Sequence, residues 1–192
     1  MTAILFPASG LSSRMGGQDK LIRPIDGVPL LFRQVQRALD VGCPVFVAVP
    51  SMDHPRAQVL ANTDAICILG SPSGLSDTLQ MAVRSMPPDD LMICLPDMPD
   101  IETQDFSRLI LTRIDHPDFK IWRYGLDGRL GHPVLFSSRL LPLFSDLSGD
   151  KGAAQIIRNH QEQMFIVETG DERFFRDLDT MDDWNAYEKS RR

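Results

Sequence analysis

Short apolar segments alternate with segments of helical periodicity along the first half of the chain. The apolar segments are mostly continuous runs of Val, Ile, Leu, Ala and Cys, which is typical of strands in a sheet covered on both faces. These predicted strands are residues 3–6, 45–49, 65–69 and 91–95. The predicted helices between them are residues 29–41, 55–62 and 75–85. Strand–helix alternation of this kind predicts a parallel sheet with right-handed crossovers.

The second half of the chain is less regular and predicts antiparallel additions at one edge of that sheet. Two predicted strands, residues 120–124 and 133–136, flank a glycine-containing turn at 125–128. The other predicted elements are helices at 103–112 and 152–160, a strand at 164–167 and a helix beginning after Thr180, which Thr180 and Asp183 would cap. The whole pattern predicts one three-layer, Rossmann-like α/β domain over residues 1–192 with a mostly parallel sheet. Ligands of open α/β sheets bind beyond the carboxyl ends of the strands, so the segments after the apolar runs are the candidate site.

Composition and charge narrow the class of protein. The chain has 192 residues, a length that suits one domain with a sizeable core. A net charge of −6 argues against nucleic-acid binding, which needs a positive field. No apolar run approaches the roughly 18–20 residues of a membrane span, and residues 1–7 are expected to be a strand and not a signal peptide. Three widely spaced cysteines form neither a zinc pattern nor a disulfide framework, which predicts a cytoplasmic protein.

The segment after the first predicted strand, residues 7–20, has the composition of an anion-binding loop. It holds three glycines, three serines and two cations, Arg14 and Lys20. Glycine lets the backbone approach a phosphate closely, and the cations offset its charge. The Walker loop is absent because Lys20 is preceded by Asp19 and followed by Leu21. The glycine fingerprint of dinucleotide-dependent dehydrogenases is absent as well.

A family resemblance rests on this loop. The order Gly10-x-Ser12-x-Arg14-Met15-Gly16-x-x-x-Lys20, followed by Gly27-x-Pro29-Leu30, resembles the opening of the nucleotidyltransferase superfamily, which includes the molybdenum-cofactor and sugar-phosphate nucleotidyltransferases. The resemblance implies that Arg14 and Lys20 are catalytic residues that hold a triphosphate. The residues that it implies for nucleotide binding in this segment are Ala8, Ser9, Gly10, Ser12 and Ser13.

The loop also departs from the family pattern in three places. Pro7 stands where the family usually has leucine, and Ser9 occupies the second position for a small residue. Gly17 is a one-residue insertion before Lys20. These departures lie near the expected position of the base and leave the phosphate-binding residues in place.

Acidic motifs later in the chain fit the same resemblance. Leu95-Pro-Asp97-Met-Pro99 follows a predicted strand, and the resemblance implies that Asp97 binds a magnesium ion between the nucleotide phosphates. Asp177-Leu-Asp179-Thr180 resembles the closing motif of the molybdenum-cofactor cytidylyltransferases. On an extended segment Asp177 and Asp179 would point the same way, and either could be the second metal ligand. The alternative for each carboxylate is a turn or helix cap.

Three further motifs are assigned to the substrates by resemblance. The segment 70–79 matches the part of such enzymes that borders base and ribose, which makes Gly74 and Ser76 candidates for nucleotide binding. The alternative is an ordinary strand–helix loop with Ser or Asp caps. The segments 131–136 and 147–153 match Gly-His-Pro-Val-Leu-Phe and Leu-x-Gly-Asp-x-Gly-Ala, which makes His132 and Asp150 candidates for binding the acceptor. Ala154 stands where the family commonly has an arginine.

The resemblance runs from residue 3 to about residue 188 and implies a magnesium-dependent nucleotidyltransferase. The expected donor is an NTP, with CTP favoured, and the expected acceptor is a phosphorylated small molecule, in particular molybdopterin. A molybdoenzyme or its chaperone is a further expected partner. The alternatives are a transferase that uses GTP or a sugar or polyol phosphate, and a non-catalytic nucleotide-binding protein that delivers the cofactor.

Overall fold

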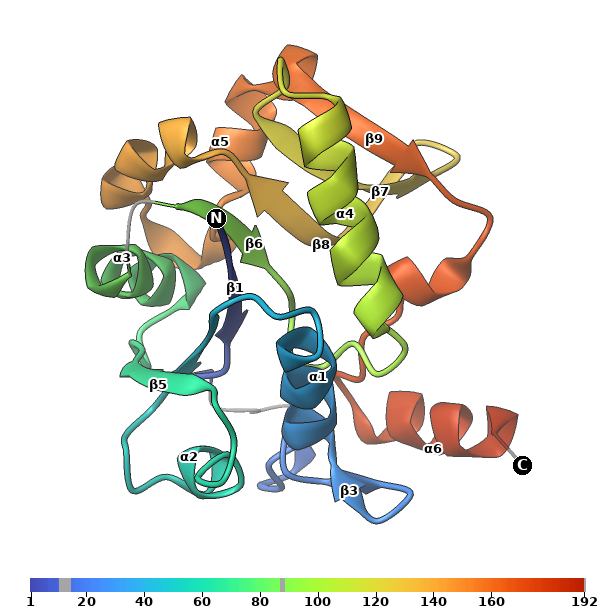
Figure 1. Ribbon diagram of the computed structural model, residues 1–192. Helices are drawn as coiled ribbons and strands as arrows, with labels where there is room; N and C mark the ends of the chain where they lie inside the picture. Colours follow the sequence, from blue (N-terminus) through green and yellow to red (C-terminus); the bar gives the residue numbers. More distant parts are fainter. Residues whose placement is uncertain (11–14, 87–88, 192) are drawn as a thin grey trace.

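The computed structural model describes residues 1–10, 15–86 and 89–191, and its centre is a seven-stranded sheet (Figure 1). The strands in spatial order are β5 (Ile66–Leu69), β4 (Val45–Val49), β1 (Thr2–Pro7), β6 (Asp90–Ile93), β8 (Arg129–Phe136), β7 (Ile121–Leu126) and β9 (Met164–Glu168). All neighbouring pairs are parallel except the two that involve β8. The carboxyl ends of six strands therefore meet at one edge of the sheet, which is where ligands bind in α/β folds.

Helices cover both faces of this sheet, which explains why its central strands β4, β1 and β6 are buried along almost their whole length. On one face Ile4 and Phe6 of β1 pack with α1 (Leu30–Leu39) and α4 (Thr103–Asp115). On the other face Ala3 and Leu5 pack with α3 (Leu75–Ser85) and α5 (Ala154–Asn159). Successive residues of a strand point to opposite faces, so β1 supplies both halves of the core.

The carboxy-terminal helix α6 (Met181–Ser190) lies apart from the sheet, against the hairpin of β2 (Pro24–Ile25) and β3 (Val28–Pro29) (Figure 1). A small apolar cluster joins them, in which Trp184 and Tyr187 of α6 pack with Ile25 and Leu30. Leu178, just before α6, belongs to the same cluster, and its N–H donates to the carbonyl of Asp97 at 3.0 Å. The chain's last segment is thereby fixed beside the end of β6.

The predicted fold class is confirmed: the sheet is mostly parallel and lies between two layers of helices. One detail differs from the prediction. The antiparallel strand β8 lies inside the sheet, and the strands beyond it, β7 and β9, run parallel to each other and to β6. The turn between β7 and β8 is Asp127-Gly128, whose φ angles of 49° and 80° suit a tight hairpin. Thr180 and Asp183 form the predicted capping box of α6.

Two kinds of element were not predicted as they are found. Helix α2 covers only Pro55–Gln58, about half of the predicted helix. Four 3-10 helices follow the hairpin or precede α6; they are η2 (Ser138–Asp146), η3 (Gly149–Lys151), η4 (Gln161–Gln163) and η5 (Glu172–Phe175). Their short irregular turns leave no 3.6-residue periodicity in the sequence. No helix in the described part of the chain combines the length and the apolar composition needed to cross a membrane.

Candidate functional site

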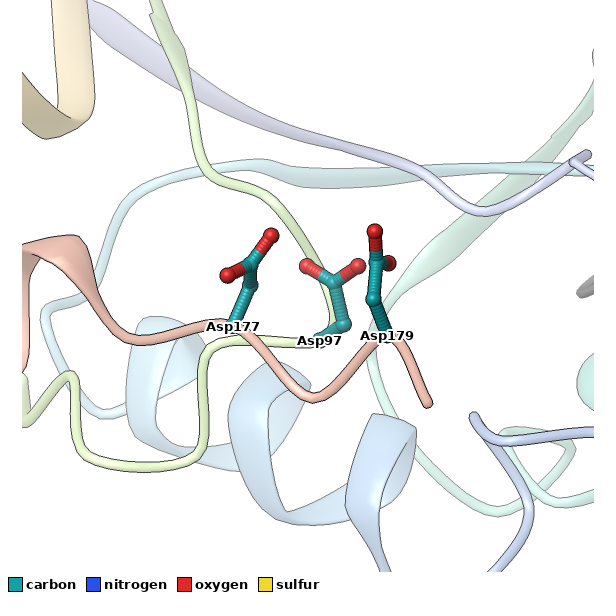
Figure 2. Close-up of side chains that lie close together, drawn as sticks. All are labelled: Asp97, Asp177 and Asp179. Carbon is teal, nitrogen blue, oxygen red and sulfur yellow. The ribbon is translucent and has the colours of Figure 1, made fainter. Parts of the chain in front are cut away.

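Three carboxylates meet at the carboxyl edge of the sheet. Asp97 follows β6, and Asp177 and Asp179 come from the extended segment before α6. One oxygen from each side chain lies within 4.8 Å of the others, and Figure 2 shows the three side chains pointing to the same side. Asp177 and Asp179 are parallel because the residue between them, Leu178, is buried in the opposite direction. The sequence prediction that these three residues come together is consistent with this geometry.

Lys20 lies between two of these carboxylates. Its Nζ donates to Oδ2 of Asp97 at 2.5 Å and to Oδ1 of Asp179 at 2.6 Å. Burial acts to lower the pKa of Lys20, but the charges and hydrogen bonds of Asp97 and Asp179 outweigh it and raise the pKa. Lys20 is therefore a permanent cation at neutral pH, held where the end of segment 7–20 meets the acidic residues.

Lys20 does not fully compensate the negative charge of Asp97 and Asp177. Burial, followed by the charges of Asp97 and Asp179, raises the pKa of Asp177. Oδ1 of Asp97 is buried and has no hydrogen-bond partner among the described residues. A buried acceptor without a partner is costly, and carboxylate oxygens are the protein ligands that hard divalent cations prefer. The residues present therefore fit a divalent cation at Asp97, Asp177 and Asp179.

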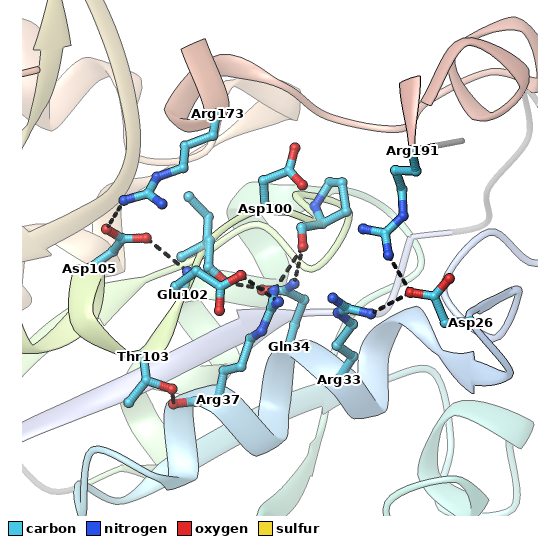
Figure 3. Close-up of polar contacts among 12 residues, drawn as sticks. Asp26, Arg33, Gln34, Arg37, Asp100, Glu102, Thr103, Asp105, Arg173 and Arg191 are labelled. Atoms are coloured by element: carbon cyan, nitrogen blue, oxygen red, sulfur yellow. Dashed lines mark hydrogen bonds and ion pairs between the residues drawn. The ribbon is translucent and has the colours of Figure 1, made fainter. Parts of the chain in front are cut away.

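Two side chains of helix α1, Gln34 and Arg37, bind the turn that follows Asp97, and Figure 3 shows both side chains. Gln34 donates to the carbonyl of Pro99 at 3.0 Å, and Arg37 donates to the carbonyls of Pro99 and Ile101 at 2.8 and 2.9 Å. Arg37 also pairs with Glu102 at 2.6 Å. These bonds hold the turn after Asp97, so its carboxylate is presented by a rigid segment.

The proposed nucleotide-binding residues of the first loop differ in burial. Ala8 and Ser9 are buried, and the Ser9 hydroxyl is 2.7 Å from the Thr78 hydroxyl and donates to the carbonyl of Ser71 at 3.1 Å. Its side chain thus joins the end of β1 to the start of α3, and the N–H of Ala8 is bonded to the carbonyl of Ala48 at 2.8 Å. Gly10 is exposed and a side chain there would meet open space. Ser12, Ser13 and Arg14 lie outside the described residues, so their assignment stays a prediction.

The two candidates at the start of α3 are placed differently from each other. Gly74 is the N-cap residue of α3, and Ser76 is fully buried with its hydroxyl 3.3 Å from the carbonyl of Ser148, to which it donates. The Ser76 side chain therefore holds α3 against the loop before η3. The assignment of Gly74 and Ser76 to nucleotide binding stays a prediction.

Of the two candidates for the acceptor side, His132 lies beside the end of β6. Val134 is paired with Ile93, so His132, two residues before it on the antiparallel strand, is level with the residues that lead to Asp97. Burial and the nearby charge of Arg123 lower the pKa of His132 to about 4, so its ring is neutral at pH 7. The side chain of Asp150 lies outside the described residues, and its role stays a prediction.

Arg56 is a site residue that the sequence pattern did not reveal. It is 2% exposed, and its guanidinium donates to both carboxylate oxygens of Asp19 at 2.8 Å and to the carbonyls of Ala8 and Gly10, each at 2.6 Å. One side chain from α2 thereby ties both ends of the loop that runs from β1 to Lys20. In the sequence Arg56 sits in a polar segment after a Pro, where an arginine is ordinarily solvated.

Replacing Arg56 by lysine is expected to lower the free energy of unfolding by about 2 kcal/mol, because buried carbonyls and one Asp19 oxygen lose their donors. Nucleotide affinity should fall as well, since the loop loses its anchor. Chemical denaturation and calorimetry of CTP binding measure the two effects. Arg33→Lys, at an exposed ion pair with Asp26, is the matched control and should change neither. Unchanged stability and affinity in Arg56→Lys would contradict the anchoring role.

The strand order and the carboxylates at the carboxyl edge of the sheet define an α/β protein with a candidate cation site, and comparison with known proteins identifies the family. The model of the MobA-like NTP transferase domain matches residues 4–164, and the chain belongs to this family. The protein is accordingly a nucleotidyltransferase. A search of curated proteins gives no match.

Solved structures share the fold over nearly the whole chain. A nucleotidyl transferase from Methanothermobacter thermautotroptrophicus, Mth528, superimposes with a TM-score of 0.81 at 18% identity, covering 99% of this chain and 97% of its own. Rv0371C from Mycobacterium tuberculosis, in complex with manganese, has a TM-score of 0.72 at 18% identity and covers 98% of each chain. A CMP:2-keto-3-deoxy-manno-octonic acid synthetase complexed with CTP has a TM-score of 0.73 at 18% identity, covering 99% and 96%.

Proposed function

We propose that the protein transfers cytidine monophosphate from CTP to the terminal phosphate of a small-molecule acceptor, molybdopterin, in a magnesium-dependent reaction that releases pyrophosphate. The observation that carries the proposal is the meeting of Lys20 with Asp97, Asp177 and Asp179 at the carboxyl edge of the sheet. A cation and three carboxylates in one crevice, below a glycine-rich loop, suit a triphosphate bound through a divalent metal.

The reaction needs positioning and charge more than a protein nucleophile. An oxygen of the acceptor phosphate attacks the α-phosphorus in line, the bond from that phosphorus to the bridging oxygen breaks, and pyrophosphate leaves with the bonding electrons. Asp97, with Asp177 and Asp179, would hold a magnesium ion, which supplies positive charge to the phosphates when bound. Lys20, already at two of the carboxylates, would balance the charge on the leaving group, and Arg14 is proposed to share this role.

Two of the structural neighbours support the choice of donor and metal. The synthetase described above is complexed with CTP, and Rv0371C is complexed with manganese, a divalent cation that oxygen ligands also bind. The choice of molybdopterin rests on the motifs at 131–136, 147–153 and 177–183, which resemble the cytidylyltransferase branch of the molybdenum-cofactor enzymes.

A pyrophosphate-release assay with each of the four nucleoside triphosphates, with and without molybdopterin, tests the proposal. We expect release with CTP and magnesium only when the acceptor is present, and none after EDTA is added. Release that depends on a triphosphate but not on molybdopterin would contradict the acceptor and keep the transferase chemistry. Binding of nucleotide with no release under any condition would favour the alternative of a delivery protein.

CTP is expected to bind more tightly than GTP in the presence of magnesium. The small residues Ala8 and Ser9 let the backbone approach the base, and the Ser9 side chain is turned away toward Thr78. The N–H and C=O of Ala8 are bonded to Ala48 and Arg56, so a backbone group of Ser9 would meet the smaller pyrimidine. Isothermal calorimetry with both nucleotides measures the preference, which we expect to be about tenfold, the effect of roughly one net hydrogen bond. Equal or tighter binding of GTP would overturn the assignment of the base.

A further inference from the structure

Arg123, in the middle of β7, is a buried arginine near His132, the candidate residue for binding the acceptor. It is 6% exposed, and its Nε and one terminal nitrogen donate to the carbonyl of Gly131 at 3.0 and 2.7 Å. In the described part of the chain Arg123 and Arg56 are the two buried arginines. Arg56 is paired with Asp19, whereas no carboxylate within the described ranges forms an ion pair with Arg123.

A buried guanidinium without a counter-ion is energetically unfavourable. The cost is visible in the pKa of Arg123, which burial lowers to about 10. One carbonyl oxygen satisfies two of its donors but none of its charge. Packing of the fold does not require a cation at this point, because Val134, the residue paired with Arg123 on β8, belongs to an apolar cluster. No described carboxylate compensates the positive charge of Arg123, and an anionic ligand would do so.

The neighbouring histidine, His132, has a ring nitrogen for which the described part of the chain provides no hydrogen-bond partner. Nδ1 of His132 is buried and lacks a hydrogen-bond partner among the described residues. The positive charge of Arg123 acts on this ring and helps to keep it neutral. An anion between the two side chains would compensate the guanidinium. Because the other ring nitrogen of His132 bonds the backbone at Ile93, Nδ1 would take up a proton and donate to this anion, so one ligand would relieve both.

The register of the sheet places this pair at the crevice. Arg123 is paired with Val134, and Val134 is paired with Ile93 of β6. Arg123 is thus level with Ile93, four residues before Asp97, and its bonds to Gly131 direct the guanidinium toward the carboxyl end. Leu130 and Ile166, each 36% exposed, lie on the flanking positions of β8 and β9. A ligand would approach the buried pair from the side of these partly exposed neighbours.

We infer that Arg123 and His132 form an anion subsite for a phosphomonoester group of the acceptor. The inference deepens the proposed function, on which it rests, by naming the residues that hold the acceptor's phosphate. The guanidinium would pair with the phosphate oxygens that do not react, while the reacting oxygen faces the nucleotide at Asp97. Arg123 would thereby distinguish phosphorylated acceptors from their unphosphorylated forms.

Inorganic phosphate is the probe for a direct binding test. The chain has four histidines, so the ring signals of His132 can be assigned in NMR spectra with a His132→Gln variant. Titration with phosphate at constant ionic strength should shift these signals saturably, and the midpoint of their pH titration should rise. The shift should vanish in Arg123→Gln, persist in part in Arg123→Lys, and be unchanged in Arg139→Gln, a control at an exposed arginine.

Steady-state kinetics give a second, independent readout. Arg123→Gln is expected to raise the KM for the acceptor by about 10–100-fold, as for loss of one charge-assisted hydrogen-bond pair, with little change in the KM for CTP. A merely structural arginine would instead alter both constants or the stability of the protein. No response of His132 to phosphate in the wild type, or an undiminished response in Arg123→Gln, would overturn the subsite. Because the phosphate titration uses neither CTP nor turnover, its failure is distinct from a failure of the proposed reaction.

Discussion

Asp97→Asn is expected to lower kcat by on the order of a hundredfold to a thousandfold, the effect of losing one preorganised charge contact in a transition state. Asparagine keeps the shape of the side chain but removes the charge that would fix a magnesium ion between protein and nucleotide. The magnesium concentration for half-maximal activity should rise in the same variant. Initial rates measured across a magnesium titration give both quantities.

The competing interpretation of Asp97 as a turn or cap residue makes the opposite prediction, since asparagine caps as well as aspartate. The contacts already speak against it: one oxygen of Asp97 accepts from Lys20, and the other has no partner among the residues that the structure describes. Stability should change little, because Lys20 keeps its bond to Asp179. Asp118→Asn, at an exposed position before β7, is the control and should leave activity unchanged. Wild-type rates with an unaltered magnesium titration in Asp97→Asn would remove the metal assignment.

Lys20→Ala is expected to lower turnover by on the order of a hundredfold or more, because the triphosphate loses a fixed cation as the bond to the leaving group breaks. The fold should be retained, since Lys20 is a loop residue whose stem adds little to the core. The metal-free protein should become less stable, because Asp97, Asp177 and Asp179 are left without the ammonium group between them. Magnesium should restore part of that stability. Turnover and thermal unfolding with and without magnesium are the measurements.

Lys189→Ala provides the matched control for this variant, because Lys189 is an exposed lysine in the last turn of α6. It should change neither turnover nor the response to magnesium. A Lys20→Ala protein with near-normal turnover would show that the phosphate site lies elsewhere. A Lys20→Ala variant that loses activity but is more stable without magnesium than with it would contradict the proposal that Lys20 compensates the negative charge of the carboxylates.

Much of the fold could be predicted from the sequence because its strands are buried on both faces. Segments such as 45–49 have no polar position to break the apolar run, and α1 shows its buried face at helical spacing. The 3-10 helices and the shortness of α2 were missed, since they have no such periodicity. The inner position of the antiparallel strand β8 was missed too, because a hairpin in the sequence does not say on which side of the sheet it is inserted.

The candidate site could be predicted where a motif carried it. Asp97 and Asp179 are 82 residues apart in the sequence, and their motifs predicted that they come together. In the fold Lys20 bonds to both carboxylates, and the N–H of Leu178 donates to the carbonyl of Asp97. Arg56 and Arg123 carry no motif: each is a buried cation, but a sequence shows an arginine without showing its exposure. The prediction for Ser76 was limited in the same way, because its burial against Ser148 depends on tertiary packing.

The central claim is that the α-phosphorus of a nucleoside triphosphate is attacked, and isotope-labelled CTP tests it most directly. The protein is incubated with magnesium, molybdopterin and CTP labelled at either the α- or the γ-phosphate, and the products are separated. Nucleotidyl transfer predicts that the α-label moves to the acceptor and that the γ-label is recovered in pyrophosphate. Appearance of the γ-label on the acceptor, or in inorganic phosphate without prior pyrophosphate, would contradict the account.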